Sequence, residues 1–243
     1  MKISGNTVLI TGGSSGIGLA LAEAFLAMDN KVLICGRRES RLIQAQQDNP
    51  DLHYMVCDVT KQEDRESLFA WATTEFDVNV LINNAGIQCD VDFTKGIEEL
   101  VSKESEIKVN FETPVYLSAL FIPHLMCKKE SAIINVTSGL AFMTSPRAIV
   151  PLYVATKAAI HSFTSLLRKQ LAETSVEVIE IIPPIVDTEI NPEGRAKRKT
   201  APKGIQPEEY VSIVMKGLSE GLQIIPSAPN HYPQPLTLLD KRN

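Results

Sequence analysis

Short runs of aliphatic residues alternate with longer amphipathic stretches along most of the chain. The short runs are apolar throughout, which is typical of strands buried on both faces of a parallel sheet, whereas the longer stretches have helical periodicity. The predicted strands are Thr7–Ile10, Lys31–Cys35, His53–Cys57, Asn79–Ile82, Ala132–Val136, Val176–Ile182 and Leu222–Pro226. The predicted helices are Ile17–Met28, Ser40–Gln47, Gln62–Thr74, Glu98–Met126, Leu152–Glu173 and Pro207–Gly221.

Strand and helix alternating in this way predict right-handed βαβ units and therefore an α/β fold with a doubly wound parallel sheet. The chain of 243 residues has the size of one large domain, and it contains neither a linker nor an internal repeat. We therefore expect a single domain over residues 1–243, with helices on both faces of the sheet.

The charge balance argues against two classes of partner. The net charge is −5 and the pI is near 5.5, so neither nucleic acid nor an anionic membrane is expected as the main partner. No apolar run approaches the roughly 20 residues of a membrane span. The first six residues lead directly into a strand without a signal peptide, so we expect a cytoplasmic protein.

The four cysteines lie far apart and form no C-x-x-C pair. Cys35 and Cys57 end predicted strands, as buried reduced cysteines often do. No two histidines have the spacing of metal ligands either, so we expect no metal site.

A glycine loop, Thr-Gly-Gly-Ser-Ser-Gly-Ile-Gly over residues 11–18, follows the first predicted strand and opens the first helix. Glycines at such a turn let backbone amides approach a phosphate group at the start of a helix. The spacing G-x-x-x-G-x-G differs from the dinucleotide fingerprint G-x-G-x-x-G, but the βαβ context is the same. The loop predicts a nucleotide site.

The end of the second strand bears on the choice of cofactor. An acidic residue there would bind the ribose 2′-hydroxyl of NAD, whereas an arginine accepts the 2′-phosphate of NADP. The chain has Cys35-Gly36-Arg37-Arg38 here, which favours NADP(H) with Arg37 as the phosphate contact. Solvated arginines at a helix entry are the alternative. Ser15 adds no second positive charge, so NAD(H) stays open as a cofactor.

Tyr153 and Lys157 lie four residues apart on a predicted helix, so their side chains project from the same face. A free tyrosine keeps its proton up to about pH 10, and an ammonium group one turn away lowers that pKa by stabilising the phenolate. The pair predicts a proton donor and acceptor. Together with a nucleotide site, it indicates hydride transfer.

These residues resemble the short-chain dehydrogenase/reductase family over nearly the whole chain. The resemblance rests on Thr11–Gly18, Asp58-Val59, Asn83-Asn84-Ala85-Gly86, Asn110, Ser138 and Tyr153-x-x-x-Lys157, in the family's order and spacing. It implies a Rossmann fold and oxidoreductase activity. Within the family the chain resembles bacterial oxidoreductases of undefined substrate, some of them encoded beside genes for D-alanine attachment to cell-wall polymers.

The resemblance also implies a role for each position. Tyr153 would exchange the proton, Ser138 would hydrogen-bond the substrate carbonyl, and Lys157 would bind the nicotinamide ribose. Asn110 would hold a water that links Lys157 to solvent. The cofactor would contact Gly12, Ser14, Ser15, Gly16, Ile17, Gly18, Arg37, Asp58, Val59, Asn84, Ala85, Gly86, Tyr153, Lys157, Pro183 and Thr188. Taken singly, the Ser, Asn and Asp positions could equally be turn or cap residues. His161, on the same helix as Tyr153, is interpreted as a packing or surface residue.

Several segments depart from the family's usual pattern or vary within it. Pro183-Pro184 replaces the usual Pro-Gly after the sixth strand, and proline removes a backbone N–H near the nicotinamide. The loop Gly139–Val150 is long and apolar and should line the substrate pocket. Asp187–Gln206 is polar, follows the strand end where ligands bind, and is a candidate substrate lid. The helices over Asn110–Met126 and Leu152–Glu173 resemble those that pair in family oligomers, which favours a homodimer or homotetramer.

These observations predict an NADP-dependent oxidoreductase, of the carbonyl reductase type, that transfers a hydride between NADPH and a small carbonyl or alcohol substrate. The alternative is a non-catalytic NADP-binding regulator on the same fold, since fold alone does not fix function. A regulator would have no need of Tyr153 or Lys157. The substrate's identity does not follow from the sequence.

Overall fold

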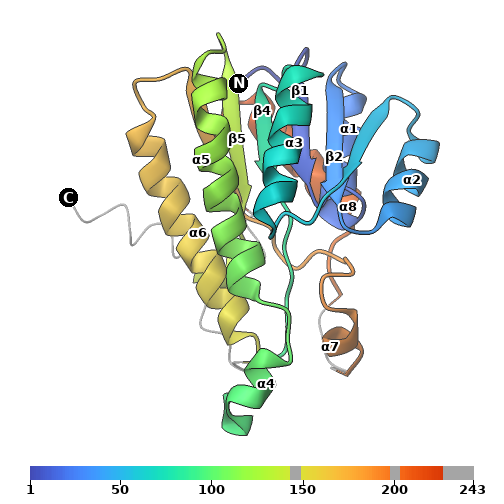
Figure 1. Ribbon diagram of the computed structural model, residues 1–243, viewed down its shortest axis with the longest axis vertical. Helices are drawn as coiled ribbons and strands as arrows, with labels where there is room; N and C mark the ends of the chain where they lie inside the picture. The colour runs from blue at the N-terminus through green and yellow to red at the C-terminus, as the bar shows by residue number, and fades with distance from the viewer. Residues whose placement is uncertain (143–148, 198–202, 227–243) are drawn as a thin grey trace.

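The central element of the protein is a parallel β-sheet in the order β3-β2-β1-β4-β5-β6-β7, seen in a computed structural model that describes residues 1–142, 149–197 and 203–226 (Figure 1). Every strand pairs in parallel with its neighbours. The strands are β1 Thr7–Thr11, β2 Lys31–Gly36, β3 Leu52–Val56, β4 Val80–Asn83, β5 Ser131–Val136, β6 Val176–Ile181 and β7 Ile224–Ile225. The predicted doubly wound sheet is confirmed, and every predicted strand end lies within two residues of the observed one.

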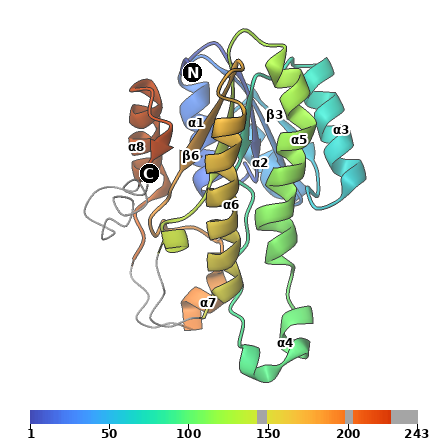
Figure 2. The same cartoon turned by 90° about the vertical axis from the view of Figure 1, so that its left-hand side faces the viewer.

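Helices cover both faces of this sheet. The α-helices are α1 Gly16–Leu26, α2 Glu39–Asp48, α3 Gln62–Thr74, α4 Ile97–Val101, α5 Thr113–Met126, α6 Pro151–Gln170, α7 Pro192–Lys197 and α8 Pro207–Ser219, with shorter turns η1 Phe93–Lys95, η2 Lys108–Glu112 and η3 Gly139–Phe142. The views show α1 and α8 on one side of the sheet and α3, α5 and α6 on the other (Figure 2). This arrangement is the predicted single-domain Rossmann fold.

Each strand is apolar at successive positions because its side chains pack into two separate cores. Val8 and Ile10 of β1 belong to the core beneath α1, α2 and α8, whereas Leu9 belongs to the core beneath α3, α5 and α6. All three are fully buried. Successive side chains of a strand point to opposite faces, so only a run without polar interruption satisfies both cores.

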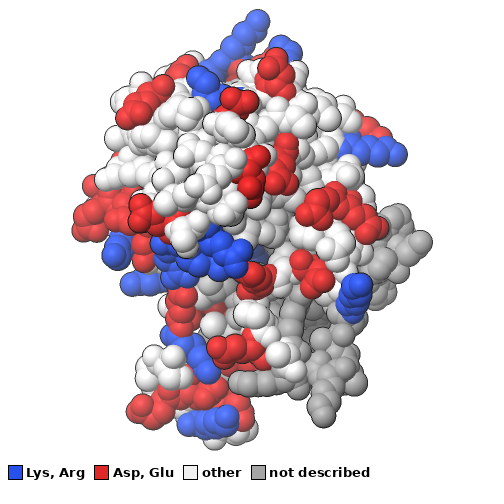
Figure 3. Space-filling model, turned by 90° about the vertical axis from the view of Figure 1, so that its right-hand side faces the viewer, with Lys and Arg blue, Asp and Glu red and all other residues white. Residues whose placement is uncertain are grey.

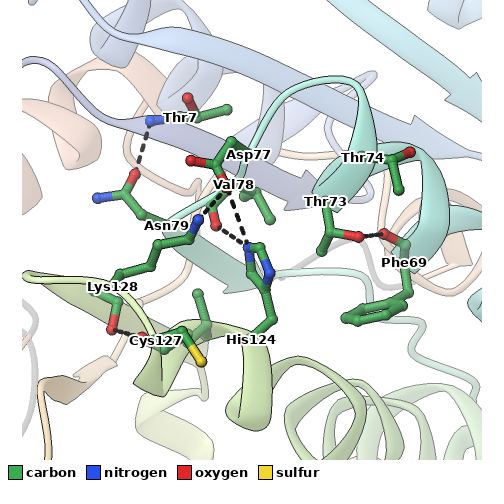
Figure 4. A network of polar contacts seen from close by, with 12 residues as sticks. Thr7, Phe69, Thr73, Thr74, Asp77, Val78, Asn79, His124, Cys127 and Lys128 are labelled. Carbon is green, nitrogen blue, oxygen red and sulfur yellow. Dashed lines mark hydrogen bonds and ion pairs between the residues drawn. The ribbon is translucent and has the colours of Figure 1, made fainter.

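A polar network holds the amino end of β4 in place, at the edge of the sheet opposite to the strand ends where ligands bind in such folds (Figure 4). Asn79 accepts a hydrogen bond from the Thr7 backbone N–H at 2.8 Å. His124 of α5 lies 2.9 Å from the carbonyl oxygen of Val78, and Lys128 pairs with the carboxylate of Asp77. These contacts fix β4 against β1 and α5, and they carry no feature of a ligand site.

The prediction of one continuous helix over Glu98–Met126 is wrong. The chain forms the short α4, leaves the helical path at Ser102–Ser105, and resumes as the π-helical turn η2 before α5. The serine hydroxyls explain the break: Ser102 donates to the Glu99 carbonyl, and Ser105 accepts from the Lys108 N–H. As a result α4 projects beyond the carboxyl edge of the sheet, as α7 also does (Figure 2).

The described helices include none that is both long and apolar enough to cross a membrane. The four cysteines, all within the described residues, are free thiols: Cys35 and Cys57 are buried, Cys89 is half-buried and Cys127 is exposed.

Candidate active site

A cavity of about 830 Å³ lies at the carboxyl ends of the central strands. In an open α/β sheet this is the edge at which ligands bind. The structure brings seventeen of the predicted site residues together on its wall: Gly12, Ser14, Ser15, Gly16, Ile17, Gly18, Arg37, Asp58, Val59, Asn84, Ala85, Gly86, Ser138, Tyr153, Lys157, Pro183 and Thr188. Asn110 is the predicted residue that does not reach the wall, because it is buried behind it.

The glycine loop adopts a conformation that needs glycine at specific positions. Gly12 and Gly16 have φ values of 64° and 55°, and a Cβ on Gly12 would lie 2.9 Å from the Ala85 Cα. A Cβ on Gly18 would lie 2.3 Å from the Gly12 carbonyl oxygen. The loop and the first turn of α1 are therefore packed so closely that backbone atoms line this part of the cavity.

Asn84 ties the turn after β4 to the glycine loop. Its side-chain amide donates to the carbonyl oxygens of Thr11 at 2.9 Å and Gly12 at 3.2 Å. The Thr11 hydroxyl in turn accepts from the backbone N–H groups of Asn84 and Ala85. Two loops that are about 70 residues apart in sequence thereby form one rigid wall.

The entry to α2 carries a group of arginines. Arg37 pairs with Glu104 through both carboxylate oxygens, and Arg38 donates to the Ser15 hydroxyl at 3.1 Å. Burial raises the pKa of the nearby Asp58 carboxyl, but hydrogen bonds from Thr60 and the charge of Arg37 outweigh burial and lower that pKa. The predicted adenine and 2′-phosphate contacts thus lie side by side.

Tyr153 and Lys157 face the cavity from one side of α6, as the four-residue spacing predicts. The Lys157 ammonium lies 5.8 Å from the Tyr153 ring centre and donates to the Val136 carbonyl at 2.8 Å. Both side chains are less than one-tenth exposed. Burial lowers the pKa of Lys157 to about 8, so its ammonium group loses its proton much nearer to neutral pH than an exposed lysine does.

Asn110 clamps the chain that runs past this pair. Its side-chain oxygen accepts from the Ile87 N–H, and its amide donates to the Ile87 carbonyl, both at 2.9 Å. Its amide also lies 3.2 Å from the Thr156 hydroxyl, next to Lys157. Gly86 lies between the two: a Cβ there would be 3.4 Å from the Asn110 oxygen and 3.6 Å from the Lys157 nitrogen.

Ser138 follows β5, where its hydroxyl oxygen accepts from the Leu140 N–H at 3.2 Å. The neighbouring Thr137 donates to the buried carboxylate of Glu180 on β6. The carbonyl of Pro183 accepts from the Gly139 N–H at 2.9 Å, so the Pro-Pro segment still makes a backbone contact at the site.

The two ends of the candidate lid, residues 187–206, lie next to each other. Val186 and Ile205 form a parallel bridge, with the Asp187 N–H donating to the Ile205 carbonyl at 2.8 Å. Asn191 accepts from the Gly194 N–H and donates to Asp90 at 2.8 Å, which joins α7 to the segment after β4. Residues 198–202 of this segment lie outside the described residues.

Sequence reasoning missed several residues of the cavity wall. Leu140, Ile149 and Val150 lie there as predicted, whereas residues 143–148 of the same loop lie outside the described residues. The missed residues include Thr137, Gln88 and Ile185, whereas Glu189 and Ile190, also on the wall, belong to the predicted lid segment Asp187–Gln206. Only their position in the segments that follow β4, β5 and β6 could have pointed to them. The interpretation of His161 is supported, since it is half-buried, pairs with Glu180 and packs edge-on against Phe142.

Comparisons with known proteins agree with this geometry. The model of the short chain dehydrogenase family matches residues 6–199. A Bacillus subtilis protein named uncharacterized oxidoreductase DltE is 55% identical over 226 residues, which are 93% of this chain and 89% of the relative. An uncharacterized oxidoreductase of Staphylococcus saprophyticus is 32% identical over 213 residues, 84% of this chain and 89% of that one.

Solved structures of the same kind superpose over almost the entire chain. A short-chain dehydrogenase from Sphingobium yanoikuyae in complex with NADPH has a TM-score of 0.80 and 26% identity, covering 97% of this chain and 92% of that one. A short chain dehydrogenase from Burkholderia cenocepacia in complex with NADP has a TM-score of 0.78 and 28% identity, covering 94% and 90%. The chain therefore belongs to the short-chain dehydrogenase/reductase family. The relatives from Bacillus and Staphylococcus are named as oxidoreductases.

Proposed function

We propose that the protein is an NADP-dependent oxidoreductase that interconverts a carbonyl compound and an alcohol, with Tyr153 as the acid and base. The observation that carries this proposal is the buried pair of Tyr153 and Lys157 on the wall of the same cavity as the glycine loop. A proton donor next to a nucleotide site is the arrangement that carbonyl reduction requires.

The residues on this wall fit a dinucleotide. A Cβ on Gly12 would lie 2.9 Å from the Ala85 Cα, and a Cβ on Gly13 would lie 2.4 Å from the Ile34 side chain. Ser15, the residue before α1, makes no side-chain hydrogen bond that caps the helix. The first amides of this helix are thus available to a pyrophosphate group. Asp58 would contact the adenine, and Lys157 the nicotinamide ribose. When bound, NADPH supplies a hydride for the carbonyl carbon.

The side chains around the substrate then handle the proton. Tyr153 gives its phenolic proton to the carbonyl oxygen as that oxygen gains negative charge, and Ser138 donates a hydrogen bond that orients the same oxygen. Lys157 holds a positive charge beside the phenolate that Tyr153 becomes. Asn110 keeps Ile87 and the loop around Gly86 in place beside the Lys157 ammonium, where the phenolate regains its proton. In alcohol oxidation the same residues act in reverse.

The preference for NADP rests on the end of β2. Gly36 stands where an acidic residue would bind the 2′-hydroxyl of NAD, and Arg37 and Arg38 follow on the cavity wall. Solved relatives with NADPH and NADP support the same choice. We further propose that residues 187–206 close over the substrate, since the Val186–Ile205 bridge gives this segment a fixed base.

We also propose a homodimer or homotetramer formed through α5 and α6. Tyr116 and Leu166 support it, because these large side chains are 55% and 61% exposed on the two helices. Apolar surface of this kind is typical of contacts between copies of a chain.

The test is Tyr153→Phe, which removes one hydroxyl and leaves the packing intact. NADPH oxidation should be followed with a panel of small ketones and quinones, and cofactor binding should be measured in parallel. We expect turnover to fall by roughly a hundredfold to ten-thousandfold while NADPH affinity stays the same. Near-native turnover of Tyr153→Phe would refute the mechanism. Absence of turnover by the native protein with every substrate would favour the non-catalytic regulator.

A further inference from the structure

One carboxylate occupies the arginines at the start of α2. Glu189 accepts from Arg41 Nη2 at 3.0 and 3.2 Å and from Arg38 Nη1 at 3.4 Å. The other terminal nitrogen of Arg38 donates to the Ser15 hydroxyl of the glycine loop at 3.1 Å. The two arginines and Glu189 are about half exposed. Lys and Arg side chains gather beside Asp and Glu on the face of the molecule that carries α2 (Figure 3).

This carboxylate belongs to the wall of the cofactor cavity. Glu189, Arg38 and Ser15 all line the cavity, and Glu189 follows Thr188 directly. Thr188 lies against the glycine loop, since a Cβ on Gly16 would be 3.0 Å from its methyl group. Glu189 therefore reaches across from the segment after β6 to the place where the glycine loop and α2 meet.

A carboxylate and a phosphate make the same contacts with arginine, because both offer paired anionic oxygens to its planar N–H groups. The 2′-phosphate is the group of NADP that distinguishes it from NAD, and it belongs at the end of β2. Arg38 and Arg41 together form a two-armed site for an anion, the fork. In this structure the Glu189 carboxylate occupies the fork in the place that an anionic ligand would take.

We propose that Glu189 is an internal competitor for the 2′-phosphate, and that it thereby sets how strongly the protein prefers NADP over NAD. This proposal rests on the NADP-binding function proposed above. Half-exposed ion pairs are weak, so a phosphate with nearly two negative charges displaces the carboxylate. The affinity for NADP is reduced by the fraction of molecules in which Glu189 occupies the fork. NAD has no group for the fork, so its affinity does not depend on this exchange.

The experiment is titration calorimetry of the full chain with NADP⁺ and NAD⁺. In Glu189→Gln we expect NADP⁺ to bind roughly three to ten times more tightly, and NAD⁺ affinity to change less than twofold. Glu193→Gln, which removes the same charge from α7, should change neither affinity. Arg41→Ala should weaken NADP⁺ about tenfold and leave NAD⁺ binding as it is. A thermal scan of each variant checks that it is folded.

The outcomes separate the two proposals. Equal affinity of the native protein for NADP⁺ and NAD⁺ would refute the proposed NADP preference, whatever Glu189 does. Native preference for NADP⁺ with unchanged or weaker binding in Glu189→Gln would overturn the competitor and leave the function intact. Glu104→Gln frees Arg37 from its ion pair. If NADP⁺ affinity rises in this variant alone, the 2′-phosphate binds to Arg37, and the proposed role of Arg38 and Arg41 is refuted.

Discussion

Glu106 is a buried acid whose ionisation should weaken the folded protein. Its side chain is 1% exposed, and one carboxylate oxygen accepts from the Cys89 N–H at 3.1 Å. The other oxygen is buried without a hydrogen-bond partner among the described residues. Burial raises the pKa of Glu106 from 4.5 to about 7, and the negative charge of Asp90 acts in the same direction against the opposing effect of the Cys89 hydrogen bond.

The sign of the pH dependence follows from that pKa. Between pH 4.5 and 7 the folded protein keeps a proton on Glu106 that the unfolded chain has lost, so stability falls as the pH rises. Each pH unit in this window costs about 1.4 kcal/mol of unfolding free energy. The full penalty well above pH 7 is at most about 3.4 kcal/mol, and roughly 2 kcal/mol of it develops between pH 5.5 and pH 8.

Glu106→Gln removes this penalty because a neutral amide can still accept from the Cys89 N–H. Urea unfolding at pH 5.5 and pH 8 should show that the advantage of the variant over the native protein grows by about 2 kcal/mol at the higher pH. Glu112→Gln, at an exposed position on the same helical segment, should show no such growth. An advantage that is equal at both pH values would mean that Glu106 titrates as an ordinary exposed acid.

Two further predictions concern the cavity wall. The value of kcat/KM for carbonyl reduction should fall as the pH rises above about 8, since Lys157 then loses the charge that stabilises the phenolate; a flat profile up to pH 9.5 would contradict this role. Gly18→Ala should lower the melting temperature by many degrees, because the new Cβ would lie 2.3 Å from the Gly12 carbonyl oxygen. Gly36→Ala is the control: its Cβ would meet other atoms only at 3.5 Å or more, so the melting temperature should change little. Similar melting temperatures for the two variants would refute the packing argument.

The sheet and its core helices were predictable because their signals are local. In the strand Lys31–Gly36, the residues that pack into either core are apolar. Such an uninterrupted apolar run by itself predicts that both faces of the sheet are covered by helices. Tyr153 and Lys157 were found for the same reason, since a spacing of four residues on a helix fixes their relative position. Interruptions of helices were harder to predict. Ser102 and Ser105 break the stretch over Glu98–Met126 through side-chain hydrogen bonds, and the periodicity of apolar residues contains no sign of such bonds.

Contacts between distant segments carry no such local signal. Glu189 and Arg41 are 148 residues apart, and Glu106 and Cys89 are 17 apart. In the sequence each is one more charged or polar residue in a polar stretch, for which a solvated surface is the natural interpretation. What makes Glu106 unusual is its burial, and what makes Glu189 unusual is the arginine fork opposite it; both follow from the way the carboxyl ends of the strands gather loops from the whole chain. Residues such as Glu106 and Glu189 can therefore be recognised only after the loops have been placed, whereas the spacing of Tyr153 and Lys157 alone places them on one face of a helix.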